Sequence, residues 1–129
     1  MMKILSWNSR GLGHPSKVAA LRDLTRNEKL DIMLIQETKQ DQREMRRIID
    51  QQKQYIGCIS DSRGASGGIV TIWDNSKWNC TSTNPHQNWI RTTLDSKTGN
   101  QTVIIYNVYV PNHYIEKEIC WDDLKTSID

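Results

Sequence analysis

Apolar and polar positions divide the N-terminal third of the chain into alternating strand and helix signals. The largely apolar run Lys3–Asn8 predicts a strand, and Ser9–Pro15, with two glycines and a proline, predicts a loop. Apolar residues recur at helical spacing from Ser16 to about Lys29, which predicts a helix. Four consecutive apolar residues within Asp31–Glu37 then predict a strand that is buried on both faces.

The remainder of the chain opens with a helix and then changes to β texture. Asp41, with Glu44 three residues later, forms a capping-box pattern that predicts a helix to about Lys53. A closing helix is expected over Ile115–Ile128. Between the two helices, short strand candidates are separated by polar turns: Tyr55–Ser60, Gly67–Trp73, Trp78–Ser82, Asn88–Leu94 and Gln101–Val110. This order predicts an α/β or α+β fold with a mixed sheet.

Length, composition and cysteine usage exclude several protein classes. The chain has 129 residues, enough for one domain. Its longest apolar runs, such as Ile32–Ile35 and Val103–Tyr106, fall far short of the roughly 18 residues of a membrane span. No export leader is visible, so we expect an intracellular protein, nuclear or cytoplasmic, and no membrane partner. Three widely spaced cysteines without a C-x-x-C pair argue against a disulfide scaffold or a structural zinc site: Cys58, Cys80 and Cys120.

The net charge is only +2, but basic residues are concentrated near the N-terminus. Residues 1–30 hold six lysines and arginines against two acidic residues. This distribution permits DNA as a partner, although a solvated helix face explains the same charges equally well.

Three polar residues stand where apolar strands end, and they are the candidates for chemistry. Asn8 and Glu37 each close a strand candidate, and ligands of open α/β sheets bind beyond such carboxyl ends. A carboxylate and an amide offer hard oxygen ligands to Mg²⁺ or Mn²⁺. Tyr109, at the end of Gln101–Val110, could donate a hydrogen bond to a phosphate oxygen without adding charge. A solvated glutamate, an asparagine that caps its own turn and a packing tyrosine remain the alternatives.

Five strings in order resemble the endonuclease/exonuclease/phosphatase superfamily, in the branch of exonuclease III and apurinic-site endonucleases. The likeness is greatest to the endonuclease domains of plant non-LTR retrotransposons. The strings are KILSWNSRGL (Lys3–Leu12), DIMLIQETK (Asp31–Lys39), SGGIVTIW (Ser66–Trp73), NVYVPN (Asn107–Asn112) and Trp121-Asp122.

The resemblance implies a hydrolytic, Mg²⁺-dependent nicking of DNA and assigns roles by position. Glu37 would ligate the metal ion, with Asn8 near the metal ion and the scissile phosphate. The Tyr109 hydroxyl would contact the phosphate, and Arg10 and Asn112 would contact the substrate. Related endonucleases often carry an acidic residue at the position of Arg10.

The resemblance covers only the first part of the family domain, which is roughly double this length. That domain is an α/β sandwich of two facing sheets, a mixed sheet among them, with outer helices. The later G-D-x-N and S-D-H strings are absent from these residues. We therefore expect residues 1–129 to form the N-terminal half of that sandwich, with weak metal binding and no nicking activity alone. An uncovered apolar sheet face would then favour self-association. A non-catalytic module that binds nucleic acid or protein is the alternative.

We also expect three strands, Lys3–Asn8, Asp31–Glu37 and Gln101–Val110, to be neighbours in one sheet. The helix that begins at Ser16 should then pack on the outer face of that sheet.

Overall fold

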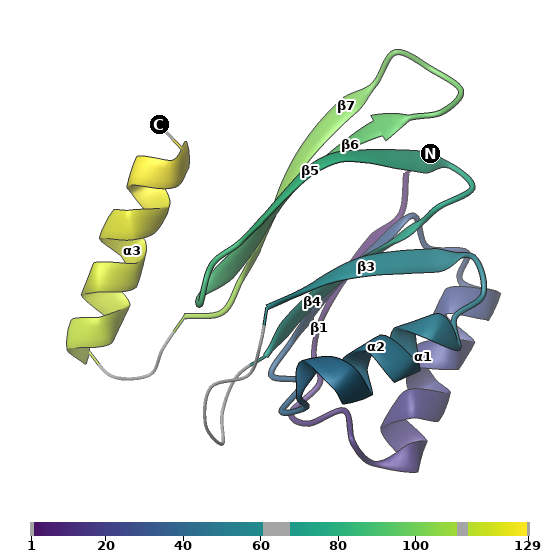
Figure 1. The fold of residues 1–129 in the computed structure, drawn as a ribbon, viewed down its shortest axis with the longest axis horizontal. Helices are drawn as coiled ribbons and strands as arrows, with labels where there is room; N and C mark the ends of the chain where they lie inside the picture. Colours follow the sequence, from purple (N-terminus) through teal and green to yellow (C-terminus); the bar gives the residue numbers. More distant parts are fainter. Residues whose placement is uncertain (1, 61–67, 111–113, 129) are drawn as a thin grey trace.

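The computed structural model of the chain describes residues 2–60, 68–110 and 114–128. The described residues form two sheets. In Figure 1, helices cover the outer face of one sheet, and the last helix, in yellow, lies at the side of the other. The elements are, in order, β1 (Ile4–Asn8), α1 (Pro15–Asn27), β2 (Ile32–Gln36), α2 (Gln42–Asp50), β3 (Tyr55–Ser60), β4 (Ile69–Asp74), β5 (Trp78–Pro85), β6 (Trp89–Ser96), β7 (Thr102–Val108) and α3 (Tyr114–Ile128).

The first sheet is mixed and the second is antiparallel. In the first sheet the strand order is β1-β2-β4-β3, with β1 parallel to β2 and the other pairs antiparallel. The second sheet has the order β5-β6-β7. The predicted α/β class, the mixed sheet and the outer helices are confirmed, as is the pairing of the first two strands.

The predicted place of the last strand in the same sheet is wrong. A tight turn joins β6 to β7, so Asp95 pairs locally with Thr102 and the two strands form a hairpin. The other edge of β2 is taken by β4, through partners such as Ile35 and Val70. The strand β7 therefore belongs to the second sheet and faces β2 across the sandwich, so the two strands are still close to each other.

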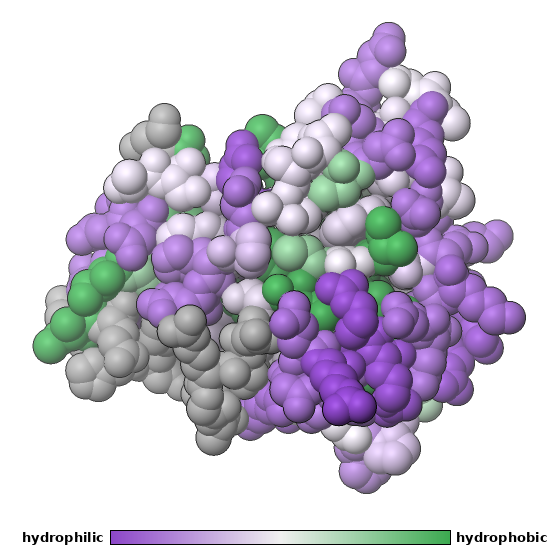
Figure 2. Space-filling model, in the orientation of Figure 1, coloured by the Kyte–Doolittle hydropathy of each residue, from purple (hydrophilic) through white to green (hydrophobic). Residues whose placement is uncertain are grey.

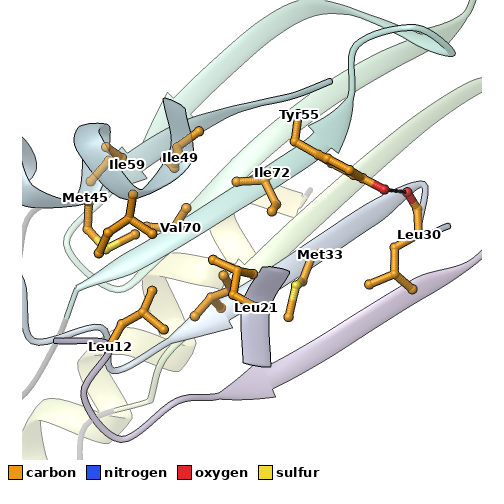
Figure 3. Packing of buried hydrophobic residues seen from close by; sticks show 12 residues of the cluster. Leu12, Leu21, Leu30, Met33, Met45, Ile49, Tyr55, Ile59, Val70 and Ile72 are labelled. Atoms are coloured by element: carbon orange, nitrogen blue, oxygen red, sulfur yellow. Dashed lines mark hydrogen bonds between the residues drawn. The ribbon is translucent and has the colours of Figure 1, made fainter. Parts of the chain in front are cut away.

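Two apolar cores hold these layers together. The outer core lies between the first sheet and the helices α1 and α2, and includes Leu21, Met33, Met45 and Ile72 (Figure 3). This packing confirms that the helix beginning near Ser16 covers the outer face. The inner core lies between the sheets and is formed by Ile32, Trp73, Trp78, Leu94 and Ile105.

Side-chain caps fix where α1 and α2 begin. The Asp41 carboxylate accepts a 2.8 Å hydrogen bond from the Glu44 amide, so the predicted helix start is confirmed. The imidazole of His14 caps α1 in the same way, by accepting a hydrogen bond from the Ser16 amide at 3.1 Å. His14 is therefore engaged in a structural contact at the surface.

The exposed apolar side chains gather on α3 more than on a sheet face. Cys120 and Leu124 of this helix are buried, and the Tyr106 hydroxyl on β7 lies 3.1 Å from the Ser127 hydroxyl and donates to its carbonyl at 3.2 Å. Hydrophilic residues cover α1 and α2, whereas apolar atoms lie over α3 at the left of Figure 2. The large exposed apolar residues of α3 are Ile115, Ile119, Trp121 and Ile128.

All three cysteines are free thiols, as their spacing predicts. Among the described residues, no helix has both the length and the apolar character that crossing a membrane requires.

Candidate active site

The loops that follow β1 and β2 run side by side at one end of the first sheet. The strands are parallel and end together, with Asn8 opposite Gln36. Backbone pairing continues beyond them, because the amides of Ser9, Gly11 and Leu12 donate to the carbonyls of residues 36, 37 and 38 at 3.0, 2.7 and 2.8 Å. The predicted meeting of the two strand ends is therefore confirmed, and the loops are held as one unit.

Three side chains in these loops are carried by an unusual backbone conformation. Arg10, Glu37 and Lys39 have φ angles of 52°, 52° and 54°, in the left-handed region that residues other than glycine seldom adopt. Such conformations cost about 1–3 kcal/mol each and persist where surrounding contacts enforce them. The paired loop backbones supply that enforcement here, and they fix the direction in which the side chains leave the sheet.

Glu37 and Tyr109 form the central contact of the site. The Tyr109 hydroxyl donates a 2.8 Å hydrogen bond to Oε1 of Glu37, although the residues follow strands of different sheets. Both side chains are half-buried. Burial, and then the hydrogen bond and charge of Glu37, raise the pKa of Tyr109. The phenol therefore stays protonated at neutral pH and acts as a donor.

The loop between β5 and β6 holds Tyr109 in place. The Tyr109 amide donates to the Asn88 carbonyl at 2.8 Å. The Asn88 amide in turn donates to Nδ1 of His86, whose ring stacks on Trp89 with centroids 3.5 Å apart. His86 is thus committed to this support.

Asn8 adopts the turn-capping conformation that was the alternative for this residue. Its Oδ1 accepts a 3.1 Å hydrogen bond from the Arg10 amide. The side chain is exposed, and its Nδ2 has no hydrogen-bond partner among the described residues. Asn8 therefore shapes the loop and also offers a donor beside the Glu37 loop.

A buried amide pair behind the site was not among the predicted residues. The Gln36 side chain donates a 2.8 Å hydrogen bond to Oδ1 of Asn107, and Asn107 is fully buried. The Asn107 amide donates to the Val70 carbonyl at 2.9 Å and to the Thr71 hydroxyl at 3.2 Å. Both residues are polar positions within otherwise apolar strands, and that pattern was the available signal.

Ser9 and Lys17 also stabilise the loops through hydrogen bonds. The sequence pattern does not distinguish these two residues from others. The Ser9 hydroxyl is fully buried and lies 3.1 Å from each of the carbonyls of Gln36 and Glu37. The Lys17 ammonium, from α1, donates to the Ser9 carbonyl. A lysine cation therefore lies directly behind the first loop.

Of the two predicted substrate contacts, Arg10 and Asn112, the structure describes only Arg10. Arg10 is exposed on the first loop, and neither it nor Lys39 makes an ion pair with any described residue. Lys3 lies at the opposite end of β1, where its ammonium donates to the Glu28 carbonyl at 3.3 Å. Asn112 lies outside the described residues.

The donor set matches a divalent cation that retains much of its water. No group of three or more His, Cys, Asp or Glu side chains gathers within the described ranges. One carboxylate is present, with Oε1 of Glu37 receiving the Tyr109 hydroxyl and Oε2 without a described donor. Mg²⁺ is often bound through one or two carboxylates plus waters, so the residues fit weak binding of such an ion.

The fold matches solved structures of DNA-processing enzymes. The 3′ phosphatase NExo from Neisseria, solved with a product DNA hairpin, has a TM-score of 0.76 and 18% identity, covering 99% of this chain and 51% of its own. An AP endonuclease from Archaeoglobus fulgidus has a TM-score of 0.70 and 17% identity over 97% of this chain and 49% of its own. An AP endonuclease from Leishmania major has a TM-score of 0.67 and 21% identity over 85% and 40%. At these identities the likeness establishes the fold.

The chain spans about half the length of these solved structures. No curated protein sequence matches it. The family model for the Endonuclease/Exonuclease/phosphatase family matches residues 5–127, nearly the whole chain. The chain therefore belongs to the Endonuclease/Exonuclease/phosphatase family.

Proposed function

We propose that the chain carries part of the active site of a Mg²⁺- or Mn²⁺-dependent DNA endonuclease of the retroelement type, working in the nucleus or cytoplasm. The observation that carries the proposal is the hydrogen bond from Tyr109 to Glu37 beside the paired loops. It puts the carboxylate that we propose as a metal ligand next to a neutral donor. The family membership and the DNA-processing enzymes that share the fold support the choice of phosphodiester chemistry.

The residues present divide the work of binding a phosphodiester. A divalent ion would supply charge stabilisation and a more acidic bound water. Glu37 would hold that ion, with the Asn8 amide oxygen as its neighbour. Tyr109 is protonated at neutral pH, and its single hydroxyl proton would turn from Glu37 to donate to a phosphate oxygen of a bound substrate. Arg10 and Lys39 add positive charge at the mouth of the site, where DNA phosphates would approach. Asn112 remains a candidate for substrate contact on sequence grounds.

Hydrolysis also needs a base to take the proton from the attacking water. His14 is used as a helix cap and His86 in the support of Tyr109, so neither is available beside Glu37 among the described residues. We therefore propose that residues 1–129 form the N-terminal half of the catalytic sandwich and do not cleave DNA alone.

A binding module without catalysis is the second candidate. Arg10 and Lys39, which pair with no acidic side chain in the described ranges, favour it, because phosphate contacts need only basic side chains at a suitable place. A module would bind DNA without any requirement for the Glu37 carboxylate, whereas an active-site half would bind more strongly in the presence of the metal ion.

The test combines nicking of supercoiled plasmid with filter binding of DNA across a salt series, each with and without Mn²⁺. We expect no nicking, and weak binding that Mn²⁺ strengthens in the native chain but not in Glu37→Gln. The matched control is Glu118→Gln, on the exposed side of α3, which should retain the Mn²⁺ effect. If the native chain and Glu37→Gln bind DNA equally, both with and without Mn²⁺, the result would favour the module and contradict the active-site proposal.

A further inference from the structure

A pocket with a volume of about 580 Å³ opens at the end of the first sheet opposite Glu37. It lies where β4 ends and β3 begins, at Asp74 and Tyr55, and beside the last turn of α1. Because β4 is antiparallel to β2, this end of the sheet is the one at which β2 starts. In Figure 1 it is the right-hand end, on the far side from the paired loops.

Four cationic side chains from three separate segments line this pocket. Arg26 and Lys29 belong to the end of α1 and the residues after it, Lys53 follows α2, and Lys77 lies between β4 and β5. Arg26, Lys29 and Lys53 make no ion pair or side-chain hydrogen bond with any described residue. Lys77 is 4.0 Å from the Asp31 carboxylate, and its side chain remains about half-exposed, at 53%.

Among the described residues, the lining of the pocket holds a single carboxylate, Asp74. It is buried and already accepts hydrogen bonds from the Gln54 amide, the Ser76 amide and the Ser76 hydroxyl at 2.9, 2.9 and 2.6 Å. The carbonyl ends of α1 and α2 also point here, and each is equivalent to about half a negative charge. Asp31 offsets part of the charge of Lys77. Within the lining itself, four cations stand against one carboxylate, and Lys53 and Lys77 lie outside the helices.

Buried polar groups that are hydrogen-bonded to one another form the floor of the pocket. The buried Tyr55 hydroxyl donates to the carbonyls of Leu30 and Thr25 at 2.7 and 3.2 Å, the first of which is drawn in Figure 3. The Thr25 hydroxyl lies 3.0 Å from Oε1 of Gln52, which is also buried. A pre-formed cavity of this size falls within the range of small-molecule sites.

We propose that this pocket binds an anion with several linked phosphates. Cations that converge from three segments suit a ligand whose charges are spread along a chain, because each phosphate can meet a different cation. Two sources share this chemistry, namely a free nucleoside polyphosphate and the backbone of a nucleic-acid strand. The site is independent of Glu37 and needs no metal ion.

The primary experiment is isothermal titration of the native chain with inorganic tripolyphosphate in buffer free of divalent metal. We expect Lys29→Gln with Lys53→Gln to weaken binding at least tenfold. The matched control removes two charges elsewhere, through Arg43→Gln with Lys125→Gln, and should change affinity less than twofold. Circular dichroism checks that each variant folds.

The proposal is overturned if Lys29→Gln with Lys53→Gln binds tripolyphosphate as tightly as the native chain. It is also overturned if Arg43→Gln with Lys125→Gln loses as much affinity as the pocket variant. Competition then identifies the source. Displacement of tripolyphosphate by a nucleoside triphosphate indicates a nucleotide site, and displacement that strengthens with the length of a single-stranded oligonucleotide indicates a nucleic-acid backbone. If neither competes, the pocket does not recognise linked phosphates in either form and the proposal fails.

Discussion

The side-chain amide of Gln36 on β2 donates a 2.8 Å hydrogen bond to Oδ1 of Asn107 on β7, and so joins the two sheets inside the sandwich. Gln36 directly precedes Glu37 in the chain, and Asn107 stands two residues before Tyr109. The buried amide pair therefore fixes the distance between the two strands that carry the proposed active-site residues. The hydrogen bond from Tyr109 to Glu37 closes the same junction at its exposed end.

Asn107→Leu should lower the free energy of unfolding by about 2–3 kcal/mol. It leaves Gln36 and the Thr71 hydroxyl buried without this partner, and an unsatisfied buried polar group costs about 1–3 kcal/mol. Urea denaturation measures the effect. The double variant Gln36→Leu with Asn107→Leu should recover part of the loss, because replacing both partners removes the unpaired amide. Strict additivity of the two single variants would show that the residues do not act as a pair.

Tyr109 should ionise at a higher pH than an ordinary tyrosine, because its pKa is raised. Burial is the main cause of its raised pKa, followed by the hydrogen bond and charge of Glu37. In Glu37→Gln the pKa of Tyr109 should therefore fall part of the way towards its usual value, since burial remains. Ultraviolet titration of tyrosinate measures this, with Tyr109→Phe subtracted to isolate the residue. An unchanged titration in Glu37→Gln would show that the contact does not persist in solution.

Tyr55 should make the stability of the fold sensitive to alkaline pH. Burial, with the charges of Asp74 and Asp31, raises the pKa of Tyr55 to about 12. The unfolded value is about 10, so the contribution of Tyr55 to stability is complete below pH 10 and is lost as the pH rises towards 12. Tyr55→Phe should unfold with a weaker pH dependence across this window.

The same variant should lose about 1–2 kcal/mol of stability at neutral pH, because the Leu30 and Thr25 carbonyls lose a hydrogen-bond donor. Denaturation curves at pH 7, 10 and 11 test both statements. If the free energy of unfolding changes with pH in the same way in the native chain and in Tyr55→Phe, Tyr55 is not the source of the alkaline sensitivity.

Gly57→Ala should destabilise the first sheet by about 1–3 kcal/mol through overpacking. A Cβ at Gly57, in β3, would lie 2.7 Å from the Thr71 carbonyl oxygen and 2.7 Å from Cγ2 of Ile72. The backbone oxygen belongs to a paired strand and cannot move aside alone. Gly99→Ala is the control, because its Cβ would meet only Ser96 Oγ at 3.7 Å. Similar melting temperatures for the two variants would contradict the packing described.

Local patterns predicted the elements well, whereas the pairing of β7 required information from outside the strand. The run of apolar residues in β2 and the cap at Asp41 are short-range signals. The first predicts the buried strand and the second predicts the start of α2, and the structure has both. The apolar content of β7 is equally compatible with either sheet, and the hairpin turn to β6 decides which sheet it joins.

The site shows the same division between local and tertiary information. A polar residue at the end of an apolar strand marks Asn8, Glu37 and Tyr109 as candidates, and the structure brings Glu37 and Tyr109 into contact. The support from Ser9 and Lys17 depends on contacts between distant segments, so sequence spacing gives no measure of it. The basic pocket is assembled from three segments and has no contiguous motif at all.

The most direct test of the account is a titration of the isotope-labelled chain with Mn²⁺, followed by nuclear magnetic resonance. A paramagnetic ion broadens signals near its binding site, so the measurement locates the ion. We predict broadening of residues 8–12, 37–39 and 109 at millimolar Mn²⁺, equivalent to about −4 kcal/mol, and its loss in Glu37→Gln. Broadening centred elsewhere, or unchanged broadening in Glu37→Gln, would contradict the claim that these loops form a metal-dependent phosphodiester site.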